Sequence, residues 1–113
     1  MSTTDCIFCR IIANEVPSER VYEDESVIAF RDLAPKAPVH VLVVPREHVR
    51  DVTELAEQPE LLAAVTRAAA HVADQEANGE FRFIFNTGET AGQTVFHAHG
   101  HVLAGTGLPE GDM

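Results

Sequence analysis

The sequence is poor in basic residues and has no apolar run that approaches the ~20 residues of a membrane-spanning helix. Its 8 Lys and Arg are outnumbered by 18 Asp and Glu, and the formal net charge is -10. A protein this acidic repels a nucleic-acid backbone or an anionic membrane surface. The first residues, MSTTD, lack both the basic and the apolar part of a secretory signal. We therefore expect a cytoplasmic protein with no nucleic-acid and no membrane partner.

Internal repeats, low-complexity tracts and linkers are also missing from the 113 residues. A chain of this length usually forms one domain. We expect residues 1–113 to be a single domain with a short acidic tail at about 106–113. The sequence has no Walker-type glycine-lysine loop and no acidic cluster suited to Mg²⁺. We therefore expect no catalytic metal.

Hydrophobic spacing predicts a short first helix and a long second one, which begins at Pro59 and ends at Asn78-Gly79. β-Branched and alternating apolar residues predict the strands. The expected elements are a helix at 5–15, a hairpin at 20–32, strands at 40–45, 81–86 and 95–104, and the long helix. Strands outnumber helices and do not alternate with them. The predicted fold class is α+β, with a mainly antiparallel five-stranded sheet, one long helix and a short N-terminal helix.

Three histidines, His97, His99 and His101, occupy alternate positions of the last expected strand. Alternate side chains share one face of a strand and lie about 6.6 Å apart, so the outer two are separated by about 13 Å. Three ligands so spaced do not easily hold one metal ion. A row of imidazoles suits phosphate oxygens instead, with one ring nitrogen free to attack phosphorus. His71 lies on the solvated side of the long helix, where we expect no function.

The two cysteines, Cys6 and Cys9, are spaced as Cys-x-x-Cys within the first expected helix. One helical turn places both sulfurs on the same face, which suits a tetrahedral zinc ion. The same spacing occurs in redox pairs, and two buried thiols are a third reading. The two residues alone do not choose among these readings.

The segment around the histidines resembles the histidine triad (HIT) nucleotide-binding proteins, whose signature is His-x-His-x-His followed by two apolar residues. Here these residues are His97-Ala98-His99-Gly100-His101-Val102-Leu103. The stretches IIANEVPSERVYEDESVIAFRDLAPKAPVHVLVVPREHV and FNTGETAGQTVFHAHGHV are similar to the two halves of the same family, so the resemblance runs from about Cys6 to Gly105. It implies a HIT-like fold and a homodimer formed through the long helix and a strand edge.

The resemblance also implies a role for each of four histidines. His99, the middle one of the triad, would be the nucleophile that forms a covalent nucleotidyl-imidazole. His101 would hydrogen-bond phosphate oxygens, and His97 would orient its neighbour. His40 matches the remaining family histidine, which supports the nucleophile.

The nucleotide and metal sites follow from the same resemblance. Asp32 matches an acidic residue that accepts hydrogen bonds from ribose, although it also suits a loop cap. The residues expected to contact the nucleotide are Val16, Phe30, Asp32, Leu33, Asn86, Gly92, Gln93 and Thr94. Core packing is the alternative for Phe30 and Leu33. A structural zinc ion would be held by Cys6, Cys9, His48 and His97.

The activity that the resemblance implies is hydrolysis at the α-phosphorus of a purine nucleoside phosphoramidate or related nucleotide conjugate, with release of a nucleoside monophosphate. The alternatives are a dinucleoside polyphosphate hydrolase, a nucleotide-binding protein with vestigial activity and a metal-sequestering protein. The sequence departs from the usual triad at Ala98 and Gly100, which are small. We expect the strand face that carries them to pack tightly against a helix. No tryptophan follows Leu103, so the tail cannot shape a pocket with that side chain.

Overall fold

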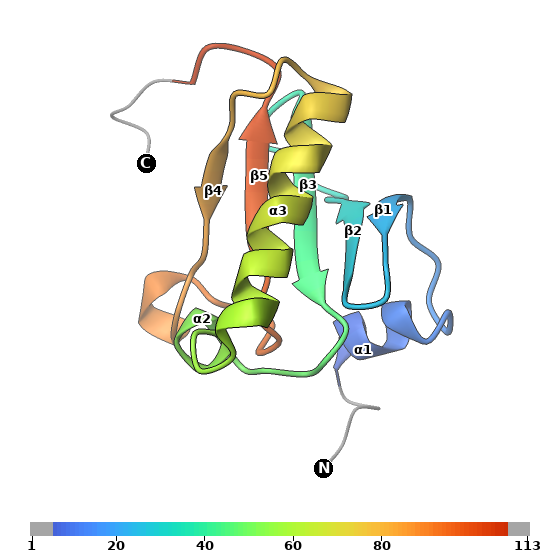
Figure 1. Ribbon diagram of the computed structural model, residues 1–113, viewed down its shortest axis with the longest axis vertical. Helices are drawn as coiled ribbons and strands as arrows, with labels where there is room; N and C mark the ends of the chain where they lie inside the picture. The colour runs from blue at the N-terminus through green and yellow to red at the C-terminus, as the bar shows by residue number, and fades with distance from the viewer. Residues whose placement is uncertain (1–5, 109–113) are drawn as a thin grey trace.

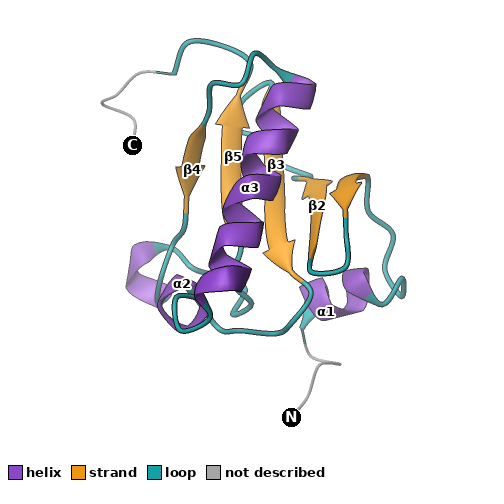
Figure 2. Ribbon diagram, viewed as in Figure 1, coloured by secondary structure: helices purple, strands orange, loops and turns teal. Residues whose placement is uncertain are grey.

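The computed structural model describes residues 6–108, which form a five-stranded antiparallel sheet with helices on both faces (Figures 1 and 2). The strand order is β1-β2-β3-β5-β4. In chain order the elements are α1 (Ile7–Ile12), β1 (Arg20–Glu23), β2 (Val27–Arg31), β3 (Val39–Pro45), α2 (Val52–Leu55), α3 (Pro59–Glu76), β4 (Arg82–Ile84), a 3-10 turn (Glu89–Ala91) and β5 (Gly100–Ala104). The predicted fold class is thereby confirmed. The expected tail lies largely outside the described residues.

The central strand β3 is buried along its whole length, and its alternating side chains supply both layers of the core. On one face Val41 and Val43 belong to the same cluster as α3. On the other face Leu42 and Val44 belong to a smaller cluster with α1. The sheet is thus covered on two sides, and His40 lies on the same face as the smaller layer under α1.

The long helix α3 has the boundaries that the sequence predicts. Pro59 occupies its first turn, where the missing N–H breaks no hydrogen bond, and the helix ends before Gly79, which has a φ of 89°. Val65, Ala68 and Val72 are buried against the sheet. Among the helices of residues 6–108, none is long and apolar enough to cross a membrane.

The short helix α2 was not predicted. Its signal is the run Asp51-Val52-Thr53-Glu54, because Asp51 accepts a hydrogen bond from the Glu54 amide at 2.9 Å. The Glu54 carboxylate reaches back to the Arg50 amide at 2.6 Å. This arrangement is a variant of the capping box, because the Glu54 carboxylate accepts from the residue before the N-cap Asp51 and not from Asp51 itself.

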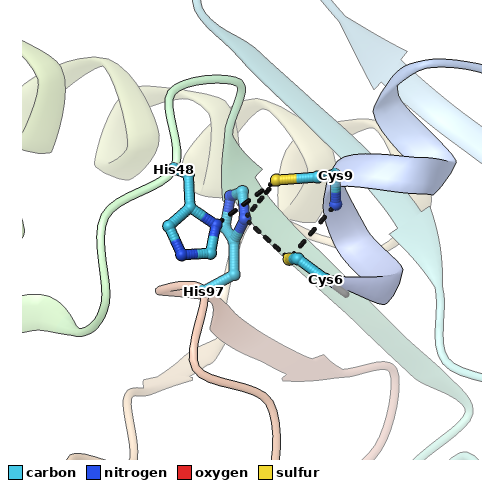
Figure 3. A group of neighbouring side chains, drawn as sticks. All are labelled: Cys6, Cys9, His48 and His97. Carbon is cyan, nitrogen blue, oxygen red and sulfur yellow. Dashed lines mark hydrogen bonds between the residues drawn. The ribbon is translucent and has the colours of Figure 1, made fainter. Parts of the chain in front are cut away.

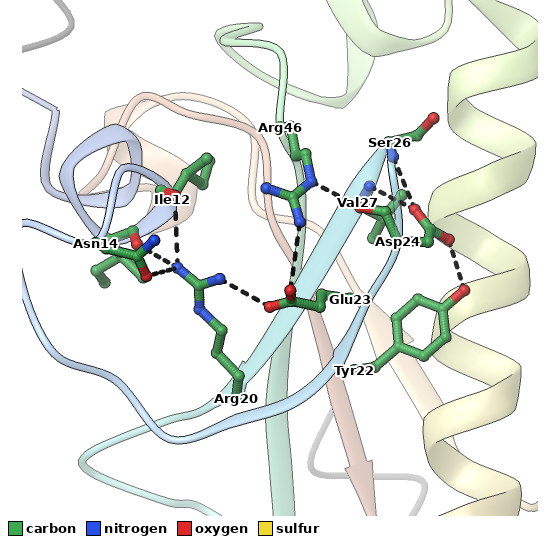
Figure 4. Close-up of polar contacts among 10 residues, drawn as sticks. Ile12, Asn14, Arg20, Tyr22, Glu23, Asp24, Ser26, Val27 and Arg46 are labelled. Carbon is green, nitrogen blue, oxygen red and sulfur yellow. Dashed lines mark hydrogen bonds and ion pairs between the residues drawn. The ribbon is translucent and has the colours of Figure 1, made fainter.

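The β1–β2 hairpin is held by polar contacts that Figure 4 shows. One oxygen of Asp24 accepts hydrogen bonds from the amides of Ser26 and Val27, each at 2.8 Å. Arg20 extends from β1 to the end of α1, where it donates to the Ile11 carbonyl at 2.6 Å and to Asn14 at 2.9 Å. Arg20 therefore ties the hairpin to the C-terminal end of α1.

Strand β5 is shorter than predicted, because it begins at Gly100 and not at residue 95. Continuing the observed register, in which Gly100 lies opposite Val43, would bring Ala98 opposite Pro45, which has no amide to donate. The Ala98 amide instead donates to the Val49 carbonyl at 2.7 Å. Consequently His97 and His99 lie in the segment before the strand, and only His101 lies within it.

The small residue Gly100 packs tightly, and the side chains nearest to it are Phe83 of β4 and Phe85, which follows that strand. A Cβ at Gly100 would lie 2.2 Å from Cε1 of Phe83 and 3.0 Å from Cζ of Phe85. The rings of Phe83 and Phe85 occupy the space that a larger side chain at Gly100 would need. The strand face that carries Ala98 and Gly100 also packs against α3, since Ala98 and Val102 belong to the same buried cluster as the α3 side chains.

Candidate active site and metal centre

Four histidines converge on the sheet face opposite α3. His40 lies in β3 and His101 in β5, and their ring centroids are 5.2 Å apart. The His99 ring lies 5.1 Å from the His101 ring. His97 lies beyond His99, so the cluster continues from the sheet to the start of α1. Residues separated by 61 positions in the chain thus share one site.

His99 has its ring orientation fixed by the backbone. Its Nδ1 lies 2.8 Å from the His97 carbonyl oxygen, which can only accept, so Nδ1 carries the ring proton. In the neutral ring, Nε2 then has a lone pair. Burial lowers the pKa of His99, and its ring packs edge-on against Phe8 at 4.9 Å. A neutral imidazole with a bare Nε2 is able to act as a nucleophile.

His40 and His101 are joined by a hydrogen bond of 2.9 Å between Nε2 of His40 and Nδ1 of His101. Asp32 approaches the same His40 nitrogen at 3.4 Å. Burial lowers the pKa of His40, and burial together with the neighbouring rings lowers the pKa of His101 to about 4. Both rings are therefore neutral at pH 7 in the absence of ligand.

His97 is fully buried and faces the two cysteines (Figure 3). Its Nε2 donates to the Pro45 carbonyl at 2.8 Å, which leaves the Nδ1 lone pair directed at the sulfurs. Nδ1 lies 3.3 Å from Sγ of Cys6 and 3.5 Å from Sγ of Cys9. Burial lowers the pKa of His97 to about 4, so the ring remains neutral and able to coordinate.

His48 completes this second group from the exposed turn after β3. Its Nδ1 lies 3.3 Å from Sγ of Cys9, and all four donor atoms lie within 4.8 Å of one another. Cys6, Cys9, His48 and His97 therefore form a possible metal site.

The donor chemistry of this group fits zinc. Two sulfurs and two imidazole nitrogens are a common structural zinc set. The bond from His97 to the Pro45 carbonyl is the outer contact that orients a ligating histidine. Burial, followed by the neighbouring Cys6, raises the pKa of Cys9 to about 11 in the absence of an ion, whereas a bound cation would displace the thiol proton.

Gln93, which is buried, holds the polar loop before the histidines in place through its side-chain hydrogen bonds. Its side-chain amide donates to the carbonyls of Arg50 at 2.7 Å and Val95 at 3.0 Å. Its oxygen accepts from the Gly88 amide at 2.8 Å. These bonds occupy the Gln93 side chain, so it shapes the loop and does not extend into solvent.

The other loop residues lie around Gln93. Gly92 has a φ of 98°, a conformation that favours glycine, and a Cβ there would lie 3.9 Å from the Asn86 amide group. Thr94 is exposed and Asn86 is half-buried. The loop thus offers the hydroxyl of Thr94 and the amide of Asn86 beside the backbone of Gly92, which no side chain of its own covers.

The residues expected around the base differ in their environments. Phe30 is buried and packs against Phe8 at a centroid distance of 5.6 Å. Leu33 is 99% exposed, and Val16 is half-buried beside the core layer under α1. Asp32 uses Oδ1 to accept from the Ala34 amide at 2.8 Å. Phe30 therefore belongs to the core of the chain, whereas Leu33 is open to solvent.

Three contributors to the site were missed by sequence reasoning. Phe8 packs against the rings of both His97 and His99, and its signal was its place between the two cysteines. Pro45 supplies a carbonyl, and Lys36 supplies an amide that donates to Nδ1 of His40 at 3.0 Å. Backbone contributions have no residue-type signal, because every residue carries a carbonyl and nearly every residue an amide.

Comparison with known proteins places this geometry in a family. A purine nucleoside phosphoramidase from Escherichia coli (strain K12) is 41% identical over 107 residues, which cover 92% of this chain and 90% of the relative. A HIT family hydrolase from Clostridium thermocellum has a similar structure, with a TM-score of 0.88, 45% identity and coverage of 93% of this chain and 94% of its own.

A histidine triad protein from Clostridium difficile has a TM-score of 0.89 to this chain at 40% identity, with coverage of 97% of this chain and 98% of its own. The HIT domain model matches residues 13–108, a region that contains the whole sheet, α3, His40 and all three histidines of the triad. The chain belongs to the HIT domain family.

Proposed function

We propose that the protein hydrolyses nucleoside phosphoramidates, or related nucleotide conjugates, at the α-phosphorus. The observation that carries this proposal is the bond from Nδ1 of His99 to the His97 carbonyl, which leaves Nε2 as a bare nucleophile. Nε2 of His99 attacks the α-phosphorus, and the P–N bond breaks as the leaving nitrogen takes a proton from solvent water and departs as the amine. Water then attacks the nucleotidyl-imidazole, releases the nucleoside monophosphate and regenerates His99. The activity of the Escherichia coli relative supports this choice.

The remaining histidines support that step in different ways. His101 donates a hydrogen bond to the phosphoryl oxygens as negative charge redistributes, and His40 orients His101 through their 2.9 Å bond. His97 holds the His99 ring through its backbone carbonyl, while its own ring faces the cysteines. His97 therefore contributes to the reaction through position.

The nucleotide is bound, in this proposal, between the Asp32 loop and the loop at 86–94. Asp32 accepts hydrogen bonds from the ribose, and Leu33, with Val16 nearby, offers apolar surface to a purine. Thr94 and Asn86 contact the phosphate or leaving group, and Gly92 allows the backbone to approach it. Gln93 keeps this loop in place, and Phe30 supports the pocket from the core.

A structural zinc ion bound by Cys6, Cys9, His48 and His97 would tie α1 to the segment that carries the triad. It would supply no chemistry to the reaction, because imidazoles provide both the nucleophile and the hydrogen-bond donor to the phosphate. We further propose that residues 1–113 form one HIT domain.

The direct test measures release of nucleoside monophosphate from adenosine 5′-phosphoramidate. We expect clear turnover by the wild type and a loss of more than about 10³-fold in His99→Ala, since the covalent route disappears with its nucleophile. The matched control is His71→Ala on the solvated side of α3, which should keep wild-type activity. Circular dichroism and nucleotide binding show whether His99→Ala remains folded.

The same assay separates the alternatives. A folded wild type that binds nucleotide but leaves the phosphoramidate intact, while cleaving a dinucleoside polyphosphate, would favour the second activity. Binding with no turnover of either substrate would make the protein a nucleotide-binding module. Equal rates for the wild type and His99→Ala would reject His99 as the nucleophile.

A further inference from the structure

One backbone amide contacts the histidine cluster without belonging to it. The amide of Lys36, in the exposed loop between β2 and β3, lies 3.0 Å from Nδ1 of His40. An amide N–H can only donate, so Nδ1 of His40 must accept and cannot carry a proton. Neutral His40 therefore carries its proton on Nε2.

The position of that proton decides the next ring. Nε2 of His40 lies 2.9 Å from Nδ1 of His101, and one of these two nitrogens must donate. Because Nε2 of His40 holds the proton, it donates the hydrogen bond, and Nδ1 of His101 accepts that bond. Neutral His101 then carries its own proton on Nε2, where it is available to an anionic ligand.

The carboxylate of Asp32 strengthens the same arrangement. Its Oδ2 lies 3.4 Å from Nε2 of His40, and an acceptor on this side also favours a proton at that nitrogen. Asp32 and Lys36 lie in one loop and face opposite ring nitrogens of His40. Both contacts therefore select the same tautomer.

A metal ion held by Asp32, His40 and His101 is the competing reading of this cluster, since their ligand atoms lie within 4.8 Å of one another. A ligating histidine normally donates its second N–H to an acceptor. With a metal on Nε2, His40 would instead have to place an N–H at Nδ1, directly against the N–H of Lys36. The outer contact thus has the wrong polarity for a metal ligand.

We infer that the backbone amide of Lys36 is a positioning group that selects the Nε2–H tautomer of His40 and thereby makes His101 a donor toward the phosphate. The kinetic part of this inference rests on the proposed function, whereas the tautomer part does not. It assigns to Lys36 a role that its side chain does not share. The relay runs from the Lys36 amide through His40 to Nε2 of His101.

The first test determines the tautomers directly in the wild-type protein. Two-bond ¹H–¹⁵N spectra of ¹⁵N-labelled protein distinguish a protonated ring nitrogen from a bare one. We expect His40 and His101 to carry their protons on Nε2, and His99 to carry its proton on Nδ1. A proton on Nδ1 of His40 would overturn the inference, whatever the activity of the protein.

The second test removes the amide. Lys36→Pro deletes the N–H, and Lys36→Ala is the matched control, because it removes the side chain and keeps the N–H. We expect Lys36→Pro to populate the Nδ1–H tautomer of His40 and to lower kcat roughly tenfold with little change in KM, less than the ~10²–10³ of a deleted donor. Lys36→Ala should retain the wild-type tautomer of His40, and its kcat measures what the side-chain charge near His40 contributes on its own.

If Lys36→Pro does not fold, an ester in place of the Pro35–Lys36 amide removes the same N–H with no change of side chain. An unchanged His40 tautomer and an unchanged kcat in a folded variant would overturn the inference. Equal losses in Lys36→Pro and Lys36→Ala would assign the effect to the side chain and would overturn it as well. A wild type without turnover would reject the proposed function, and the spectra would then decide the tautomers alone.

Discussion

Single residues of this protein depend on their neighbours to a degree that their identity does not reveal. Gly100 is the clearest case, because its missing side chain is the space that the ring of Phe83 fills. That ring is flanked by Phe81 at 6.1 Å and Phe85 at 4.9 Å, which limits its movement. The requirement for glycine here arises from packing between β4 and β5.

We predict that Gly100→Ala lowers the free energy of unfolding by about 1–3 kcal/mol, the usual effect of overpacking. Phe83→Leu in the same chain should restore part of that loss, because it vacates the site of the new methyl group. Urea unfolding of the single and double variants gives the coupling between them. Gly107→Ala, which meets no atom within 4 Å, is the matched control. Wild-type stability in Gly100→Ala would show that the ring moves freely.

The lowered pKa of His101 leads us to predict that the stability of the protein depends on pH. Its folded-state pKa of about 4 lies below the ordinary value of 6.5, so between these values the unfolded chain binds a proton that the folded chain does not. The free energy of unfolding should therefore fall as pH decreases from about 6.5 to about 4, by at most about 1.4 kcal/mol per pH unit for this group.

The measurement is urea unfolding of the wild type and His101→Gln across that pH range. His101→Gln should show a shallower slope, and His71→Gln, an exposed position on α3, should keep the wild-type slope. Parallel slopes for the wild type and His101→Gln would contradict the prediction.

At the scale of elements, α1 depends on its contacts for stability. It has only six residues, too few to be stable alone, and it buries Phe8 and Ile11 against the sheet. Arg20 holds its end, and the two cysteines lie at its start. A metal ion at Cys6 and Cys9 would therefore fix the start of α1 to the triad segment.

We predict that Cys9→Ser lowers the zinc content from about one ion per chain toward zero, because a hydroxyl is a poor zinc ligand. The melting temperature should fall by several degrees, since about 1 kcal/mol corresponds to roughly 4–8 °C in a domain of about this size. Elemental analysis and thermal melts provide the two readings. A chelator should lower the melting temperature of the wild type and leave that of Cys9→Ser unchanged. A zinc-free wild type would contradict the prediction and leave Cys6 and Cys9 as free thiols.

At the scale of the whole molecule, one edge of the sheet has features that favour pairing with a second chain. β4 is an edge strand, and its three residues are all half-buried within one chain. Phe81, Phe83 and Phe85 pack only partly against the core on this side. An edge strand flanked by partly exposed apolar side chains favours pairing with another strand.

We therefore predict a homodimer, which light scattering would detect as a mass of twice the 12.3 kDa chain. Small-angle scattering provides a second reading, because a single chain has a Cα radius of gyration of 13.4 Å and a pair must exceed it. A mass of one chain across a wide range of concentrations would reject the homodimer.

Much of this architecture is predictable from local sequence. The boundaries of α3 follow from Pro59 and Gly79, because these residues act within one turn of the helix. The predicted length of β5 is wrong, because the start of this strand depends on Pro45, which lies more than 50 positions before it in the chain. The helix α2 was missed although Asp51 and Glu54, three positions apart, have the sequence pattern of a capping box.

Residue type and spacing are enough to mark the three histidines of the triad, Cys6 and Cys9 as candidates, whereas His40, His48 and the metal role of His97 are candidates through the resemblance to the HIT family. Only the tertiary structure decided which nitrogen of each ring carries a proton. That choice depends on the carbonyls of Pro45 and His97 and on the amide of Lys36. Every residue presents similar backbone groups, so only the folded chain determines which of them meets a given imidazole.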